Sequence, residues 1–288
     1  MRKFSIGSWA FLFNQDQPTA DFHTLVHKLG HMGFQGIELG AFAPHPNPDS
    51  HDTKEKRQKL RKMVTDHRLE FSGYAPLMWT EKLWSVEDHR PFLALFEKHA
   101  NFAEDLGIKT MRIDTVEPVA SAASFDPKLL FDRCVKAFDA CSKIAANHNL
   151  TLAWEFEPGF ALNKPDEVVA LVDAVRAAGN GNFGVLLDTW NAHVCSAGKS
   201  LDLLQRLKGK ITHLHLSDSD GTVNEYNGPV HVTLGQGVLN FDQLMPELLT
   251  GGVPDDWWCV DLCFWPDAWT GTADSKRFLD KLRHKYAA

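Results

Sequence analysis

The chain of 288 residues contains no run of apolar residues long enough to cross a bilayer. It also has no cluster of Lys and Arg, and its formal net charge is -7. Binding to nucleic acid depends on clustered basic side chains that release counterions from the phosphate backbone. We therefore expect a soluble protein that has neither a membrane nor a nucleic acid as its partner.

Cysteine is present but does not form a recognisable motif. The five cysteines include no C-x-x-C pair, and an odd count in a chain of this length is not typical of a disulfide framework. The opening stretch "MRKFSIGSWAFLF" resembles a signal peptide, but Gln15, Asp16 and Gln17 follow it without a small-residue cleavage site. We interpret this stretch as a first strand and expect the protein to remain in the reducing cytoplasm.

Short β-like runs alternate with longer amphipathic helical runs along the whole chain. The expected helices include residues 20–33 and 127–149, where apolar residues recur at helical spacing. Eight runs have the composition of strands: residues 4–9, 36–40, 69–74, 108–115, 150–157, 183–189, 211–216 and 257–262. This pattern predicts an α/β fold, a (β/α)8 TIM barrel that forms a single domain over residues 1–288, although a doubly wound sheet has a similar periodicity.

The last four predicted strands carry acidic or imidazole side chains near their C-terminal ends, where barrels of this kind have their active sites. Alternation places these side chains on one face: Glu155 and Glu157 on the fifth strand, Asp188 on the sixth, His215 on the seventh and Asp261 on the eighth. Two carboxylates ~4 Å apart repel by about 4 kcal/mol at an effective dielectric constant of about 20, so such a group must take up protons or bind a cation. Oxygen and nitrogen ligands without a thiolate favour Mn, Mg, Co or Fe, with Zn as an alternative.

Each of these residues also has a simpler interpretation. Asp188 or Asp261, taken alone, is more often a helix cap or a turn residue than a ligand. His213, which lies deeper along the seventh strand, fits a core histidine with satisfied hydrogen bonds equally well. The shared face and the shared strand end favour a site, because four independent caps would have no reason to gather there.

Residues of the earlier strands and of two loops complete the expected surroundings of the site. The longest irregular segment, residues 217–240, directly follows the seventh strand, and loops of this length are usually functional. We expect this segment and residues 265–269 to border the substrate. Asp218 is either a turn residue or a partner for substrate hydroxyls. By alternation the earlier strands offer further candidates: Trp9, Glu38, Tyr74, Arg112 and Asp114.

Four motifs carry a resemblance to a known family: "LTLAWEFEPG", "GVLLDTWNAHV", "ITHLHLSDSDG" and "WWCVDLCF". In this order and spacing they resemble the xylose isomerase-like TIM barrel superfamily, specifically its sugar phosphate isomerase/epimerase branch, and the similarity extends over essentially the whole chain. The resemblance implies one divalent metal ion bound by Glu155, Asp188, His215 and Asp261. It also implies that Glu155 and Asp261 transfer protons at the carbon next to a metal-polarised carbonyl of a sugar or polyol. The residues expected to contact this substrate are Trp9, Glu38, Tyr74, Arg112, Glu157, Asn191, His193 and Asp218.

Two positions depart from the pattern of the epimerases. Asp261 stands where they generally have glutamate, which withdraws the carboxylate by about 1.5 Å. A misplacement of about 1 Å can cost on the order of 100-fold in rate. Asn191 stands where a histidine usually follows Asp188 by three residues, with His193 two positions further on. Dehydration of keto-inositols, elimination from 3-keto-glycosides and a sugar-binding barrel without activity therefore remain alternatives to isomerisation or epimerisation.

An abasic-site endonuclease shares this fold, but its function differs. It needs a trinuclear zinc cluster with several more histidines and a basic DNA-binding surface, which a net charge of -7 does not favour. The stretch "LGQG" at residues 234–237 is the candidate backbone nest for a substrate phosphate. A homo-oligomer is compatible with the pattern.

Overall fold

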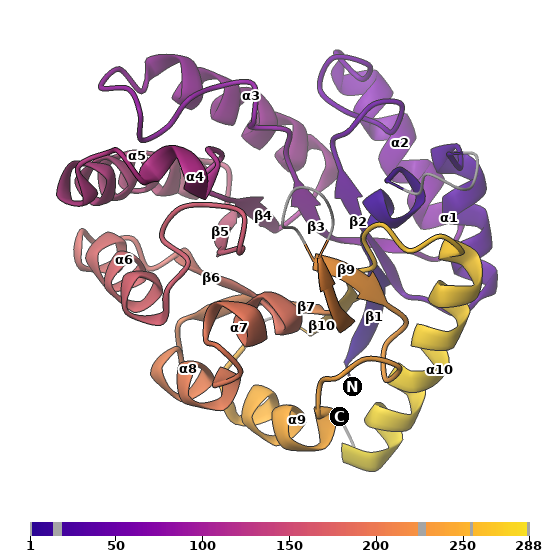
Figure 1. Cartoon of the computed structure of the whole chain (residues 1–288). Coiled ribbons are helices and arrows are strands. Elements are labelled where there is room, and N and C mark those ends of the chain that lie inside the picture. Colours follow the sequence, from indigo (N-terminus) through magenta and orange to yellow (C-terminus); the bar gives the residue numbers. More distant parts are fainter. Residues whose placement is uncertain (1, 14–18, 224–228, 254–255, 287–288) are drawn as a thin grey trace.

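Eight parallel strands form the centre of the computed structural model, which describes residues 2–13, 19–223, 229–253 and 256–286 (Figure 1). The strands are β1 (Lys3–Ile6), β2 (Gly36–Gly40), β3 (Glu70–Ala75), β4 (Thr110–Ile113), β5 (Thr151–Glu155), β6 (Phe183–Asp188), β7 (Ile211–Leu216) and β10 (Trp257–Val260). They follow the order β1-β10-β7-β6-β5-β4-β3-β2. A parallel bridge between Gly7 and Glu38 joins the two ends of this sheet, so the strands form a barrel. The predicted TIM barrel is thus confirmed.

The helices form a ring around the strands, as Figure 1 shows. The outer helices are α1 (Phe22–His31), α2 (Lys54–Asp66), α3 (Arg90–Leu106), α5 (Pro127–Asn147), α6 (Pro165–Ala177), α8 (Ser200–Arg206), α9 (Phe241–Thr250) and α10 (Ala268–Tyr286). Three short helical segments follow strand ends: η1 (Ser8–Phe11), α4 (Val119–Ala122) and α7 (Thr189–Cys195). Among the described residues, no helix is long and apolar enough to cross a membrane.

Side-chain patterning explains why these segments adopt their conformations. Asp21 and Asp126 accept hydrogen bonds from the first backbone N–H groups of α1 and α5, which fixes where both helices begin. Apolar side chains on the inner faces of the helices pack against the outside of the strands, as Phe92 and Phe96 of α3 do without exposure to solvent. The strands β2, β6 and β7 are buried along their whole length, as expected for a parallel sheet covered on both faces.

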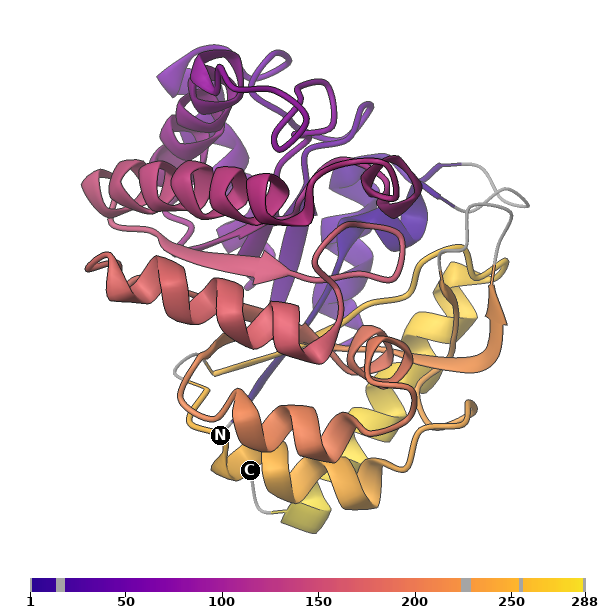
Figure 2. The same ribbon diagram turned by 60° about the vertical axis from the view of Figure 1, so that its left-hand side comes forward.

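The sequence predicts an irregular segment at residues 217–240, and this prediction is wrong, because part of the segment forms strands. The segment contains an antiparallel hairpin of β8 (Asp218–Val223) and β9 (Pro229–Val232), whose connecting residues 224–228 lie outside the described part of the chain. The register pairs Ser219 with His231. In Figure 2 a hairpin strand lies at the right of the molecule, on the side toward which the arrow of β5 points, so the hairpin borders the C-terminal end of the barrel.

One buried carboxylate joins the start of this hairpin to the segment that follows it. The Asp218 side chain accepts hydrogen bonds from four backbone N–H groups, at 3.0, 3.0, 3.0 and 3.2 Å: Ser219, Gly235, Gly237 and Leu239. A Cβ atom at Gly237 would lie 2.1 Å from Asp218 Oδ1, so this position requires glycine. Asp218 therefore stabilises the loop and does not provide the substrate contact that we expected. The candidate phosphate nest at residues 234–237 is filled by this carboxylate.

We predict that Asp218→Ala lowers the free energy of unfolding by about 2 kcal/mol or more, because buried N–H groups left without an acceptor cost about 1–3 kcal/mol each. Urea unfolding of the purified variant measures this change. The matched control is Asp220→Ala, which removes an exposed carboxylate that accepts from Thr222 in the same strand. Equal stability of the two variants would contradict the role given to Asp218.

Candidate functional site

Four side chains predicted as metal ligands meet at the C-terminal end of the barrel. Neighbouring strands place them there, since Asp188 of β6 lies in register with His215 of β7, and Asp261 directly follows β10. Each residue offers one nitrogen or oxygen atom, and these atoms lie within 4.8 Å of one another. The group, which we call the ligand cluster, is buried and comprises Glu155, Asp188, His215 and Asp261.

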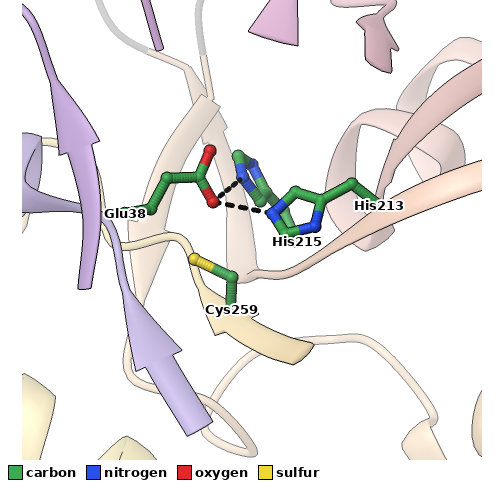
Figure 3. A group of neighbouring side chains, drawn as sticks. All are labelled: Glu38, His213, His215 and Cys259. Atoms are coloured by element: carbon green, nitrogen blue, oxygen red, sulfur yellow. Dashed lines mark hydrogen bonds and ion pairs between the residues drawn. The ribbon is translucent and has the colours of Figure 1, made fainter. Parts of the chain in front are cut away.

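Glu38 fixes the orientation of the imidazole of His215. Its Oε2 atom lies 3.1 Å from His215 Nε2 and 2.7 Å from His213 Nε2, and Figure 3 shows both contacts meeting at this one oxygen. A carboxylate only accepts hydrogen bonds, so Nε2 of His215 carries a proton, and Nδ1 is the nitrogen that offers a lone pair once the ring is neutral. Burial opposes protonation of the ring, but without a cation nearby the Glu38 charge raises the pKa of His215 well above its ordinary value. That Nδ1 atom lies 3.5 Å from Glu155 Oε1 and 3.6 Å from Asp261 Oδ2. The Nδ1 atom therefore faces the other members of the ligand cluster.

The location of Glu38 changes its predicted role. We expected a substrate contact, but Glu38 is 1% exposed and lies among His213, His215 and Cys259. Gly73 provides the space for its side chain, since a Cβ atom there would lie 2.9 Å from Glu38 Cδ. Burial opposes ionisation, but the charges of His215 and His213 outweigh it and lower the pKa of Glu38. Glu38 is thus an ionised partner of the candidate ligand His215, an arrangement common around protein metal sites.

The ligand cluster has the properties of a divalent metal site. In the part of the chain that the structure describes, Asp188 Oδ2 and His215 Nδ1 are buried without a hydrogen-bond partner. Asp188 Oδ1 accepts from Asn191 N at 2.7 Å and caps α7, so this residue is a helix cap and a candidate ligand at once. Ligand atoms around an ion with bonds of about 2.1 Å lie roughly 3 Å apart, close to the spacing seen around His215. Oxygen and nitrogen donors fit Mn, Mg, Co, Fe or Zn.

Arg112 of β4 binds three carboxylates beside the ligand cluster. Its guanidinium group donates to Glu155 Oε2, to Glu157 Oε1 and, at 2.7 Å, to Asp114 Oδ2. Burial opposes ionisation of Glu155, but the Arg112 and His215 charges lower its pKa. Burial raises the pKa of Glu157 well above its ordinary value, against the effect of Arg112. The pKa values of the two glutamates at this strand end are therefore shifted in opposite directions.

Asp261 is held by residues from two other parts of the chain. Its Oδ1 atom accepts from Trp9 Nε1 at 2.7 Å and lies 3.4 Å from Nδ1 of His231. The sequence did not single out His231, because it falls in the segment predicted to be irregular. The alternating stretch "PVHV" at residues 229–232 was the available signal for a strand there. When the ring is neutral, His231 Nδ1 accepts from the backbone N–H of Cys263 at 3.1 Å and the ring proton is on Nε2. Burial opposes protonation, but the Asp261 charge raises the pKa of His231, which favours a protonated ring that pairs with Asp261.

A cavity of about 470 Å³ opens above the ligand cluster. Six of the residues predicted for the site line it: Trp9, Arg112, Glu155, Glu157, Asn191 and Asp261. Asn191 Nδ2 lies 3.4 Å from Glu155 Oε1, so this asparagine is near the proposed base. His231 also lines the cavity, and its Nε2 atom has no hydrogen-bond partner among the described residues.

Tyr74 and His193 lie outside the cavity lining, contrary to our expectation. Tyr74 contacts His99 Nδ1 at 2.5 Å and packs against α3, because the preceding Gly73 faces Glu38 inside the barrel and alternation turns residue 74 outward. His193 stacks on Trp190, with ring centroids 5.4 Å apart. Residues two positions apart on a helix do not share a face, so His193 cannot lie beside Asn191. The predicted border residues Trp265 and Trp269 pack against the hydrophobic core.

We predict that Glu38→Gln weakens binding of Mn²⁺ by about 10- to 100-fold, the range typical of lost partners of ligand histidines. The substitution keeps the shape of the side chain but removes the charge that orients His215. Isothermal titration calorimetry measures the affinity. Glu70→Gln, which removes an exposed carboxylate on β3, serves as the control and should bind as the wild type does. Wild-type affinity in Glu38→Gln would show that Glu38 does not act on the site.

The affinity for Mn²⁺ should also depend on pH. Burial raises the pKa of Asp188 to about 6. To bind a metal, this carboxylate must be ionised and the His215 imidazole, whose pKa the Glu38 charge raises against the effect of burial, must be neutral. Binding should therefore weaken as the pH falls, by up to about tenfold per unit for each group that takes up a proton, with the Asp188 contribution appearing below about pH 6. Titrations at about pH 5, 6, 7 and 8 measure this dependence. A constant affinity over this range would contradict the involvement of Asp188.

Comparison with known proteins places the chain in a family. The sequence model of the xylose isomerase-like TIM barrel matches residues 26–282. The inosose dehydratase of Bacillus velezensis is 22% identical to the chain over 220 residues, which cover 72% of this chain and 67% of the dehydratase. The solved structure of the IOLI protein with a bound zinc atom superimposes with a TM-score of 0.77 at 16% identity over 98% of both chains.

The D-psicose 3-epimerase of Clostridium cellulolyticum H10, solved with D-tagatose, also has a TM-score of 0.77, at 15% identity over 98% of both chains. At these identities the structural similarity demonstrates the fold. The match to the family's sequence model extends over most of the barrel. The chain therefore belongs to the xylose isomerase-like TIM barrel family.

Proposed function

We propose that the protein is a metal-dependent isomerase or epimerase that moves a proton at a carbon next to the carbonyl of a sugar or related polyol. The observation that carries this proposal is the ligand cluster, whose four donor atoms lie within 4.8 Å of one another beneath the cavity. The enzymes named among the similar proteins act on compounds of this class, which supports the proposal. When bound, a divalent metal would polarise the carbonyl and acidify the adjacent C–H bond.

Glu155 is the proposed base. Its low pKa keeps it ionised at neutral pH, and Arg112 holds its Oε2 atom while Oε1 faces the ligand cluster. Asp261 is the proposed partner that handles the proton on the other side of the substrate carbon. Trp9 fixes this short carboxylate in place. Glu157 lines the same cavity with a raised pKa, so it can carry a proton that Asp261 is too short to deliver.

A second candidate function is dehydration, and His231 is the observation that favours it. In this reaction Glu155 removes the proton from carbon, the C–O bond of the neighbouring carbon breaks, and the departing hydroxyl takes a proton to leave as water. The Nε2–H of His231, at the cavity wall beside Asp261, is suited to donate that proton. Similarity to an inosose dehydratase also supports this candidate.

Solvent exchange tests the proton transfer without knowledge of the product. The Mn-loaded protein is incubated in deuterated water with a panel of ketoses, keto-inositols and 3-keto-glycosides, and NMR detects the label. We expect Glu155→Gln to abolish incorporation, whereas His231→Gln should reduce only dehydration. Asp261→Glu should retain or raise exchange, because it restores the reach of the carboxylate. Undiminished turnover in Glu155→Gln would rule out its role as base.

A further inference from the structure

Five aromatic side chains form a continuous row along the mouth of the cavity. Phe13, Phe42, Trp79, Phe160 and Phe264 come from the loops after five different strands, and all five line the cavity. Successive ring centroids are separated by 5.8 Å from Phe264 to Phe13, 5.2 Å from Phe13 to Phe42, 5.4 Å from Phe42 to Trp79 and 6.3 Å from Trp79 to Phe160. We call this row the aromatic arc.

The aromatic arc is partly exposed to solvent, at a position where polar side chains are more usual. Trp79 is 43% exposed and Phe264 is 38% exposed, while the other three rings are half-buried. Phe264 also has a φ of 61°, in the left-handed region that favours glycine and is strained for a bulky residue. Contiguous exposed apolar patches mark binding sites. A strained, exposed phenylalanine therefore points to a ligand that covers it.

The aromatic arc offers almost no hydrogen-bonding side-chain atom. Phenylalanine has none, and the indole N–H of Trp79 donates to Asp114 Oδ2 at 3.1 Å. The polar lining residues instead belong to the floor of the cavity, around Glu155 and Asp261. Sugar rings do stack on aromatic faces, but their hydroxyls also need polar partners. A flat apolar group suits the aromatic arc better than a second sugar unit does.

The charges of the cavity lining disfavour substrates with a phosphate or carboxylate group. Among the described residues that line the cavity, Arg112 is the only Lys or Arg, and three carboxylates already bind it. Glu155 and Asp261 add negative charge to the same wall. Asp218 fills the backbone nest that could have bound phosphate. The cavity is therefore unsuited to a phosphate or carboxylate group on the substrate.

We propose that the substrate is a neutral molecule of two parts, a sugar or polyol carrying an aromatic or similarly flat apolar substituent. The substituent packs against the aromatic arc, and the polyol part lies on the polar floor. The position of the polyol part rests on the proposed function. A cavity of about 470 Å³ is within the roughly 300–1,000 Å³ typical of sites for ligands larger than a single small sugar.

Calorimetry with three neutral probes tests the proposal: phenyl β-D-glucopyranoside, methyl β-D-glucopyranoside and cellobiose, each titrated into the Mn-loaded protein. We expect the phenyl glucoside to bind at least about tenfold more tightly than the other two, since only its ring buries apolar surface on the aromatic arc. Phe42→Ala and Phe264→Ala should each remove most of this preference, so that the phenyl and methyl glucosides bind each variant with similar affinity. Leu129→Ala, an exposed apolar side chain outside the cavity, is the control.

Equal binding of the phenyl and methyl glucosides, tighter binding of cellobiose, or no binding of any probe would overturn the proposal. So would a phenyl preference that persists in both phenylalanine variants, because the ring would then bind elsewhere. Free phenol separates this proposal from the proposed function. If phenol binds as tightly as the phenyl glucoside and binding depends on Phe264, the aromatic arc is supported and the polyol site on the floor is contradicted.

Discussion

Repulsion between buried carboxylates is the main constraint on the C-terminal end of the barrel, and the arrangement of the other side chains there depends on it. Glu155, Asp188 and Asp261 are almost fully buried within one group, where their negative charges repel strongly. Arg112 compensates part of this charge, but it reaches only one member of the ligand cluster. The structure leaves Asp188 Oδ2 and His215 Nδ1 without hydrogen-bond partners among the described residues. A divalent cation at this position would balance the charge and satisfy both atoms.

The fold meets this constraint with residues that are distant in the sequence. Glu38 and His213 are 175 residues apart in the sequence, yet they are in contact. The same Glu38 oxygen also orients the imidazole of His215 on β7. Trp9 reaches Asp261 across 252 residues, and Asp218 joins the hairpin that carries His231 to the segment after it. Parallel strands make this possible because their C-terminal ends meet at one edge. The rigid barrel therefore positions the polar floor, while the loops supply the aromatic mouth.

Local patterns in the sequence were sufficient to predict the barrel and to predict that the four side chains of the ligand cluster lie close together. Alternation along a strand predicts which side chains face the barrel interior, and the strand end predicts which of them lie at its C-terminal end. Glu155, Asp188, His215 and Asp261 could therefore be grouped from the sequence. Alternation could not place Tyr74, whose orientation follows from a glycine that makes room for Glu38. The hairpin and His231 were missed because Ser, Asp and Gly favour turns. In the structure a single buried carboxylate, with four backbone donors, organises that segment.

Anomalous X-ray scattering from a crystal of the Mn-loaded protein is the most direct measurement of the metal site. The geometry predicts one ion at the C-terminal end of the barrel, bound by Glu155, Asp188 and Asp261 and by the Nδ1 atom of His215. An ion bound among Glu38, His213 and Cys259, or one that contacts His215 through Nε2, would contradict the orientation that Glu38 imposes on this imidazole. The absence of any ion at these strand ends in a crystal grown with excess Mn²⁺ would contradict the metal site itself.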